Sequence, residues 1–381
     1  MIDPTEPVLD VFFDERVLDH DTGHGLFEMD TDLPLAVLDQ HAETRERVAN
    51  MRSLLARGPI SEYLRWHAPQ RLATIDELAS VHDRAYIDSV RDFSEAGGGW
   101  ITPSTVMSAQ SWEPTLAAAG ASLAAADAVI AGTSQRAFAL VRPPGHHAQP
   151  AQADGNCLFN NAALVVERAR AAGFERVAVL DWDVHHANGT QACFYDRADV
   201  LTISLHMRHG SWDLNTHPQS GSPDEIGEGA GRGYNANLEL PLGMGDSAHI
   251  AMLEQVAVPM IDRFAPELLV VAAGQDASEI DPNGRQAVKL DGFRAFGGIA
   301  RDLADRHCDG RMVITQEGGY ARAFAALCLH ATLEGIGRTS KLLDDPVSFL
   351  PERTDGTDAA IAAVREALAG TPLDPAQRDT A

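Results

Sequence analysis

The chain has 381 residues, of which 45% are hydrophobic and 22% are charged, as in a globular enzyme with a sizeable core. Its 55 acidic residues outnumber its 30 basic residues and give a formal net charge of −25. This balance argues against nucleic-acid binding, which needs a basic surface, and favours cationic small molecules or basic peptides as ligands.

The start of the chain shows neither the basic nor the apolar segment of a signal peptide, and no apolar run approaches the roughly 18 residues of a membrane span. The four cysteines form no C-x-x-C pair and are typical of reduced thiols. We therefore expect a cytoplasmic protein with no membrane partner.

Short apolar runs alternate with helical patterns, which predicts an α/β domain with a parallel sheet covered on both faces. The predicted strands are Ala137–Val141, Val177–Leu180, Val200–Leu205, Leu268–Ala272 and Met312–Thr315. The predicted helices are Asn161–Ala172, Ala248–Phe264, Gly292–Arg306 and a segment from Tyr320 to about Gly335. No linker divides the chain, so we expect a single catalytic domain over residues 1–370 and a flexible tail over 371–381. The long segment Gly210–Gly233 is a candidate active-site rim.

Polar motifs follow four of the predicted strands. They are RPPGHH at 142–147, DWDVHHANG at 181–189, GQD at 274–276 and QEGGY at 316–320. Open α/β sheets bind ligands outside the carboxyl ends of their strands. We therefore expect these four motifs to meet at one edge of the sheet.

The second of these motifs has the spacing of a metal site. Asp181, Asp183 and His185 alternate along the chain, and alternate side chains of extended backbone share one face. Carboxylates and an imidazole suit a divalent metal, and Asp276 stands at another strand end, where it can supply a further ligand. Two carboxylates and one histidine leave a position open for water, which predicts a catalytic zinc site rather than a structural one.

His146 and His147 follow a Pro-Pro-Gly turn that fixes them at a strand end. Amide hydrolysis by water needs a group that takes the water proton and later gives it to the leaving amine, and a histidine serves both steps. Asp181 and Asn188 are available to fix the tautomer of such a histidine. Tyr320 follows two glycines that allow close backbone approach, and its hydroxyl can donate to a developing oxyanion.

The motifs RPPGHHA, DWDVHHANGTQ, LTISLH, AGQDASEIDP and QEGGY, in this order, resemble the histone deacetylase superfamily. The chain is most similar to the class II-like bacterial histone deacetylase-like amidohydrolases and acetylpolyamine amidohydrolases. The resemblance runs from VFFDERVLDHDTGHG near the start to the helix after Tyr320. It implies the arginase/deacetylase fold, an eight-stranded parallel sheet within a three-layer α/β sandwich.

The resemblance also implies a role for each site residue. Asp183, His185 and Asp276 would bind Zn²⁺, which acts as Lewis acid and water activator. His147, partnered by Asn188, would be the general base and acid. His146, hydrogen-bonded to Asp181, would assist electrostatically. Tyr320 would polarise the scissile carbonyl.

Members of this family also bind structural potassium. A first potassium site would use Asp181, Ser204 and backbone carbonyls of Asp183, His185 and Leu205. A second would use backbone groups around Phe194, Arg197, Val200 and Tyr234.

Two positions depart from the family pattern at the substrate tunnel. The family motif G-F-C, whose Phe lines one wall, reads Gly155-Asn156-Cys157 here, and the facing Phe aligns with His217. His186, Gln275 and Gly318 complete the predicted tunnel. Loss of two aromatic walls weakens packing against an aliphatic lysine stem unless Trp212 replaces them. We therefore expect an acetylated small amine or polyamine as substrate, with protein acetyl-lysine as the alternative.

Two alternative hypotheses for the function of the chain remain. An arginase-like ureohydrolase would share the fold but needs additional carboxylates that bridge two manganese ions. A pseudo-deacetylase would bind acyl ligands or partner proteins without catalysis, although every expected site residue is present. By analogy with its relatives, the chain can also form a homo-oligomer, as a dimer or tetramer.

Overall fold

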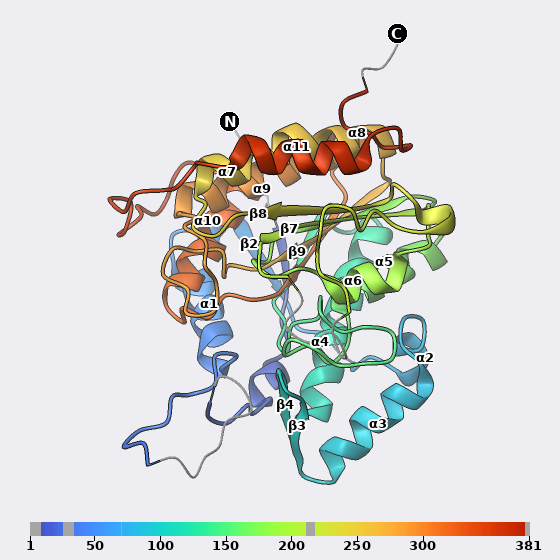
Figure 1. Ribbon diagram of the computed structural model, residues 1–381. Helices are drawn as coiled ribbons and strands as arrows, with labels where there is room; N and C mark the ends of the chain where they lie inside the picture. The colour runs from blue at the N-terminus through green and yellow to red at the C-terminus, as the bar shows by residue number, and fades with distance from the viewer. Residues whose placement is uncertain (1–8, 26–33, 70, 211–217, 378–381) are drawn as a thin grey trace.

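The computed structural model describes residues 9–25, 34–69, 71–210 and 218–377, and its centre is an eight-stranded sheet (Figure 1). The strand order is β2-β1-β5-β10-β9-β6-β7-β8, and every neighbouring pair is parallel. The strands of this sheet are β1 (Leu9–Phe12), β2 (Leu64–His67), β5 (Arg136–Ala139), β6 (Val177–Asp181), β7 (Val200–Met207), β8 (Asn235–Leu240), β9 (Leu268–Ala273) and β10 (Met312–Gln316). The predicted eight-stranded parallel sheet is therefore present.

The central strands are continuous apolar runs, as expected where both faces of a parallel sheet are covered. Every residue of β6, β7, β9 and β10 is buried. The five predicted strands are confirmed to within two residues at each end. Strands β1, β2 and β8 were not predicted, because polar residues interrupt their short apolar runs.

Helices cover both faces of the sheet (Figure 1). One layer contains α4 and α5, and the other contains α9 with α10, α11 and the α7–α8 segment. The helices are α1 (Arg45–Arg57), α2 (Ile75–Leu78), α3 (Arg84–Glu95), α4 (Trp112–Ile130), α5 (Asn161–Ala171), α6 (Asn188–Phe194), α7 (Asp246–Met252), α8 (Val258–Phe264), α9 (Leu290–His307), α10 (Phe324–Gly337) and α11 (Thr357–Leu368). A hairpin of β3 (Gly98–Thr102) and β4 (Thr105–Ser108) lies beside α3.

Two predicted helices differ in detail from the structure. The segment predicted as one helix over 248–264 contains a π-helical turn at Leu253–Ala257, between α7 and α8. The helix predicted from Tyr320 begins only at Phe324, because the preceding residues form a loop that carries part of the site. Among the described residues, none of the helices has both the length and the apolar composition that crossing a membrane requires.

The end of the chain packs further than the predicted boundary at residue 370. Thr371, Leu373 and Asp374 are buried, and the Thr371 hydroxyl donates to the Leu368 carbonyl. Packing of the domain thus extends into the first part of the segment predicted as a tail.

Candidate metal centre and active site

The four motifs that follow predicted strands meet in the middle of the sheet. Their strands β5, β10, β9 and β6 are consecutive neighbours in the sheet, although they are far apart in the chain. Because all four strands run in the same direction, their carboxyl ends lie along one edge. The predicted convergence is therefore present, and each motif contributes side chains to one buried cluster.

Asp183, His185 and Asp276 form the centre of this cluster. Their ligand atoms all lie within 4.8 Å of one another, and all three side chains are buried. The His185 Nδ1 lies 3.1 Å from Asp183 Oδ1 and 3.2 Å from Asp276 Oδ2. Strand β6 ends at Asp181, so the two ligands that follow it lie on a loop rather than on extended backbone. Two carboxylates and one imidazole are a donor set that suits a catalytic zinc ion.

Backbone amides hold the two carboxylates in place. The N–H of Gly318 donates to Asp183 Oδ2 at 2.8 Å, and that of Val184 donates to Asp276 Oδ1 at 2.9 Å. A Cβ atom on Gly318 would lie 2.2 Å from Asp276 Oδ2 and 2.5 Å from Asp183 Oδ2. A Cβ on Gly274 would lie 2.2 Å from Asp183 Oδ2. Glycine is therefore required at both positions, because the backbone passes against the ligand atoms.

The electrostatics of the cluster call for a cation between the carboxylates. Burial and the neighbouring Asp183 carboxylate raise the pKa of Asp276 to about 7. Burial lowers the pKa of His185, but the two carboxylates outweigh it and raise that pKa to about 10. The protein atoms alone thus favour a positive charge at the centre of the cluster, and the residues present fit a divalent metal ion.

The tandem histidines differ in partner and in charge. His146 Nδ1 lies 3.1 Å from Asp181 Oδ2, whereas His147 Nδ1 lies 2.6 Å from Asn188 Oδ1. Burial disfavours the charged form of His146, but Asp183 and Asp181 raise its pKa well above the usual value. Burial, and then the positive His146 and His185, lower the pKa of His147 well below the usual value. The pair is therefore split into a charged and a neutral imidazole, which assigns base chemistry to His147.

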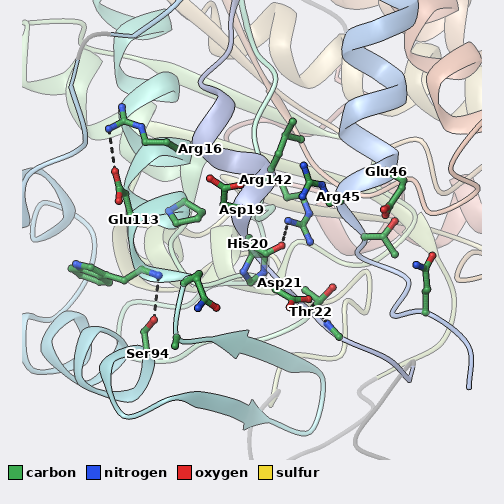
Figure 2. Close-up of a pocket in the computed structure, with 18 of the residues that line it drawn as sticks. Arg16, Asp19, His20, Asp21, Thr22, Arg45, Glu46, Ser94, Glu113 and Arg142 are labelled. Carbon is green, nitrogen blue, oxygen red and sulfur yellow. Dashed lines mark hydrogen bonds and ion pairs between the residues drawn. The ribbon is translucent and has the colours of Figure 1, made fainter.

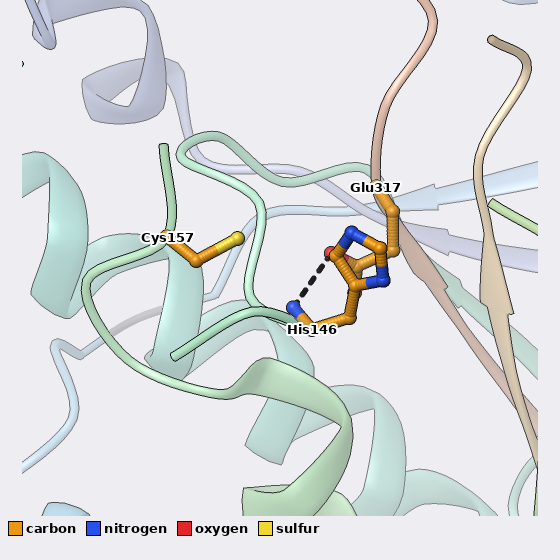
Figure 3. A group of neighbouring side chains, drawn as sticks. All are labelled: His146, Cys157 and Glu317. Atoms are coloured by element: carbon orange, nitrogen blue, oxygen red, sulfur yellow. Dashed lines mark hydrogen bonds between the residues drawn. The ribbon is translucent and has the colours of Figure 1, made fainter. Parts of the chain in front are cut away.

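Glu317 is a buried residue that helps to build the site and that sequence reasoning did not single out, although it stands in the QEGGY motif. Its side chain is fully buried, and one carboxylate oxygen accepts from the backbone N–H of Gly145 at 2.7 Å. The same oxygen accepts from the backbone N–H of His146 at 3.1 Å (Figure 3). Its other oxygen accepts from the Thr315 hydroxyl. The carboxylate thus links the end of β10 to the loop that follows β5 and holds the backbone in place at the tandem histidines.

His146, Cys157 and Glu317 also lie close enough together to resemble a second metal site (Figure 3). Their donor atoms are already engaged, since His146 bonds Asp181 and Glu317 accepts from two amides. Burial raises the pKa of the Cys157 thiol well above its usual value, so the thiolate that a metal would need is disfavoured. We therefore interpret this group as structural, and Cys157 as part of a wall rather than a nucleophile.

Tyr320 is held by its backbone and by a buried arginine. Asp281 Oδ2 accepts from the N–H of Tyr320 at 2.6 Å and of Ala321 at 3.0 Å. The guanidinium of Arg47 lies 5.0 Å from the centre of the Tyr320 ring and also donates to the Gly319 carbonyl at 2.8 Å. Burial, Asp183 and Asp276 raise the pKa of Tyr320 well above its usual value. Its hydroxyl therefore keeps its proton and remains a hydrogen-bond donor.

Arg47 belongs to a buried ion cluster behind the site. Glu43 Oε1 accepts from Arg47 at 2.8 Å and from Arg142 at 2.9 Å, and all three side chains are buried. Arg142 also lines a cavity of about 870 Å³ together with His20 and Thr22 (Figure 2). This cavity lies between the N-terminal segment, the start of α1 and the loop before α4, and none of the three candidate metal ligands lines it. No sequence pattern indicated the Arg47–Glu43–Arg142 cluster.

The predicted tunnel residues are only partly brought together. A Cβ on Gly155 would lie 2.2 Å from the His147 ring, so Gly155 directly borders the base. His186 instead bonds Gln191 at 2.9 Å, and Gln275 uses its amide within the protein, donating to Ala273 and accepting from Gln316. His217 and Trp212 lie outside the described residues.

The residues predicted to bind potassium lie at the two ends of β7. Asp181 pairs with Ser204 across β6 and β7, and both line a small cavity of about 10 Å³ together with Asn237. Phe194, Arg197, Val200 and Tyr234 lie at the other end, between the end of α6 and the start of β7 and β8.

Known proteins share this arrangement. The histone deacetylase domain family matches residues 41–336. Histone deacetylase 8 of Arabidopsis thaliana is 44% identical over 361 residues, which cover 94% of this chain and 95% of that protein. A histone deacetylase-like amidohydrolase of Pseudomonas aeruginosa is 40% identical over 344 residues, with 88% of each chain covered.

A solved structure, that of the HDA15 HD domain, superposes with a TM-score of 0.81 at 31% identity and covers 96% of this chain and 94% of that one. Together with the eight-stranded parallel sheet, this likeness confirms the arginase/deacetylase fold. The matched segment contains the metal cluster, both histidines and Tyr320. The chain therefore belongs to the histone deacetylase family.

Proposed function

We propose that the chain is a zinc-dependent amidohydrolase that removes an acetyl or other acyl group from an amine. The observation that carries this proposal is the buried cluster of Asp183, His185 and Asp276, with the neutral His147 and the protonated Tyr320 hydroxyl beside it. Zinc held by these three ligands would act as a Lewis acid and lower the pKa of water.

The chain's own residues supply the remaining chemistry. The unprotonated Nε2 of His147 takes a proton from the attacking water as the water oxygen adds to the amide carbon. The Tyr320 hydroxyl donates to the oxyanion that forms on the former carbonyl. The protonated His147 then gives its proton to the leaving nitrogen, so the products are a free amine and a carboxylic acid, which loses its own proton to solvent. His146 stays charged and offsets the negative charge that develops nearby.

We infer an acetylated small amine or polyamine as the substrate. Asn156 replaces the expected aromatic wall, and its side-chain oxygen is buried without a hydrogen-bond partner. Such an acceptor favours a substrate that carries a donor near the amide, because an unsatisfied buried oxygen is costly. The net charge of −25 attracts cationic amines over long range.

A second candidate is deacetylation of protein lysines. It is supported by the 44% identity to a plant protein named a histone deacetylase. A basic peptide would also be attracted by the acidic surface. The two candidates differ in what the tunnel wall contacts, so a substrate comparison distinguishes them.

The test is turnover of a panel of acetylated polyamines, other small acetylated amines and acetyl-lysine peptides by zinc-loaded protein and by Tyr320→Phe. We expect the small amines to be preferred and the phenylalanine variant to lose about 10²- to 10³-fold in kcat, as for removal of an oxyanion donor. Preference for the peptides would favour the second candidate. Zinc binding without turnover of any amide would contradict hydrolysis and favour a pseudo-deacetylase.

We also propose potassium as a structural ion near Asp181 and Ser204. The small cavity between β6 and β7 supports this proposal, since the residues that line it include a carboxylate, a hydroxyl and an amide. We expect potassium chloride to raise the melting temperature more than sodium chloride at equal ionic strength. Equal melting curves in both salts would argue against a selective site.

A further inference from the structure

His147 is oriented by a row of buried polar groups that continues past Asn188. Its Nδ1 lies 2.6 Å from Asn188 Oδ1, and Asn188 Nδ2 donates to Asp154 Oδ2 at 2.9 Å. The second oxygen of Asp154 accepts from the Ser104 hydroxyl at 3.0 Å. His147, Asn188 and Asp154 are all at least 97% buried, so water does not compete for these bonds.

The chemistry of Asp154 determines which group donates and which accepts in each hydrogen bond of this row. A carboxamide can present either its oxygen or its NH₂ group to a neighbour, and the two orientations look alike in outline. An ionised carboxylate only accepts hydrogen bonds, so Asp154 requires the NH₂ group of Asn188 to face it. The oxygen of Asn188 then faces His147 and must accept from it. His147 therefore carries its proton on Nδ1, and its Nε2 carries no hydrogen.

We propose that Asp154 is a positioning residue for the hydrolytic reaction, because it fixes the amide of Asn188 and through it the tautomer of His147. The proposal rests on the proposed function, in which Nε2 of His147 takes the water proton. With the opposite tautomer Nε2 would already carry a hydrogen and could accept none. Asp154 adds no step to the reaction, and its charge stabilises the imidazolium that forms when the proton arrives.

One short turn, from Asp154 to Cys157, both positions the Asp154 side chain and leaves room for the His147 ring. The N–H of Asp154 donates to the Cys157 carbonyl at 3.2 Å, and the N–H of Cys157 donates back at 2.7 Å. Within this turn Gly155 has a φ of +48° and passes so close to the His147 ring that a Cβ would overlap it. The segment that forms the predicted tunnel wall therefore also sets the state of the base.

The first test replaces the carboxylate by an amide of the same shape. In Asp154→Asn the side chain at 154 can donate or accept, so Asn188 is free to turn over and the tautomer of His147 becomes mixed. We expect kcat for the best substrate of the panel to fall about 10- to 100-fold, as for other partners that orient a site group, with KM unchanged. The matched control is Asp345→Asn, which makes the same change at a buried carboxylate that accepts from the Leu290 and Val347 amides. The control should keep the wild-type kcat.

A rescue and a spectrum separate positioning from simple structural support. In Asp154→Asn/Asn188→Asp the carboxylate moves next to His147, accepts from Nδ1 directly and should restore most of the lost kcat. Ring ¹⁵N chemical shifts of His147, assigned by comparison with His147→Ala, should show a proton on Nδ1 in the wild type and a mixture in Asp154→Asn.

Three results would overturn the proposal. The first is a wild-type kcat in Asp154→Asn, and the second is an unchanged tautomer in that variant. The third is a loss of kcat that follows a loss of melting temperature and is not restored by the double variant. Because the ¹⁵N measurement needs no substrate, it tests the row of hydrogen bonds even if the protein hydrolyses no amide.

Discussion

The candidate metal cluster and the predicted tunnel wall at Gly155 and Asn156 lie on either side of His147 and are built in different ways. Asp183 and Asp276 follow central strands, are fully buried and accept from backbone amides at 2.8 to 2.9 Å. The wall at Gly155 and Asn156 belongs to a turn in which both residues have positive φ, +48° and +66°. The sheet therefore positions the candidate metal ligands, whereas a loop determines the shape of the predicted wall that would contact the substrate.

Removal of a ligand should have the largest effect. Asp276→Asn replaces a carboxylate by a neutral amide, so we expect zinc affinity and kcat/KM each to fall more than about 100-fold, beyond the loss typical of partners that only orient a ligand. Metal content after equilibrium dialysis and turnover at fixed zinc measure the two effects. Full zinc occupancy with normal turnover would show that Asp276 is not a ligand.

A methyl group beside the ligands should have the next largest effect. Gly318→Ala places a Cβ 2.2 Å from Asp276 Oδ2, which the packed cluster cannot absorb without moving a ligand. We expect zinc affinity to fall about 10- to 100-fold.

Gly298→Ala in α9 is the matched control, since a Cβ there has no atom within 4 Å. This variant should keep full zinc affinity and gain up to about 1 kcal/mol of unfolding free energy from the better helix propensity of alanine. Equal zinc affinities for the two variants would contradict the close approach at Gly318.

A substitution in the predicted wall should change which substrates are preferred and should leave zinc binding and the hydrolytic step unaffected. Asn156→Gly removes the carboxamide and still fits the positive φ. Loss of one hydrogen bond to a substrate donor corresponds to about a 3- to 10-fold lower kcat/KM for polar acetylated amines. Apolar acetyl amides should be affected less, and zinc content should not change. A uniform loss across the panel would mean that Asn156 supports the site rather than selects the substrate.

The pH dependence of stability tests the packing around the wall rather than the chemistry of the site. His82 is buried beside Phe159, where its Nδ1 donates to the Gln149 carbonyl and its Nε2 accepts from the Asn160 N–H. Burial lowers its pKa from 6.5 to about 4, so the unfolded chain binds a proton in this window that the folded chain does not. The free energy of unfolding should therefore fall as pH drops from about 6.5 towards 4, by up to about 1.4 kcal/mol per pH unit from this residue.

Urea unfolding curves of the wild type and His82→Gln across this window measure the contribution of His82. The variant should show the shallower pH dependence, because its side chain at 82 does not titrate. Parallel curves would show that His82 does not remain neutral in the folded protein.

The contrast between cluster and wall also explains what the sequence could predict. The ligands lie directly after long apolar runs, so their convergence follows from the geometry of a parallel sheet. Glu317 and Asp154 escaped prediction because their partners are backbone amides and an asparagine more than 30 residues away. Arg47 lies in α1 and Glu43 just before it, and neither belongs to a motif. Only the fold brings Arg47 against Tyr320 and Glu43 against Arg47. The predicted contribution of His217 lies outside the described residues.

The most direct measurement is a zinc titration of metal-free protein, with turnover of an acetylated amine recorded at each step. A site made of Asp183, His185 and Asp276 predicts that activity rises linearly to one zinc ion per chain and then stays constant. A break at two ions per chain, or activity that manganese supports and zinc does not, would contradict a mononuclear zinc amidohydrolase and favour arginase-like chemistry.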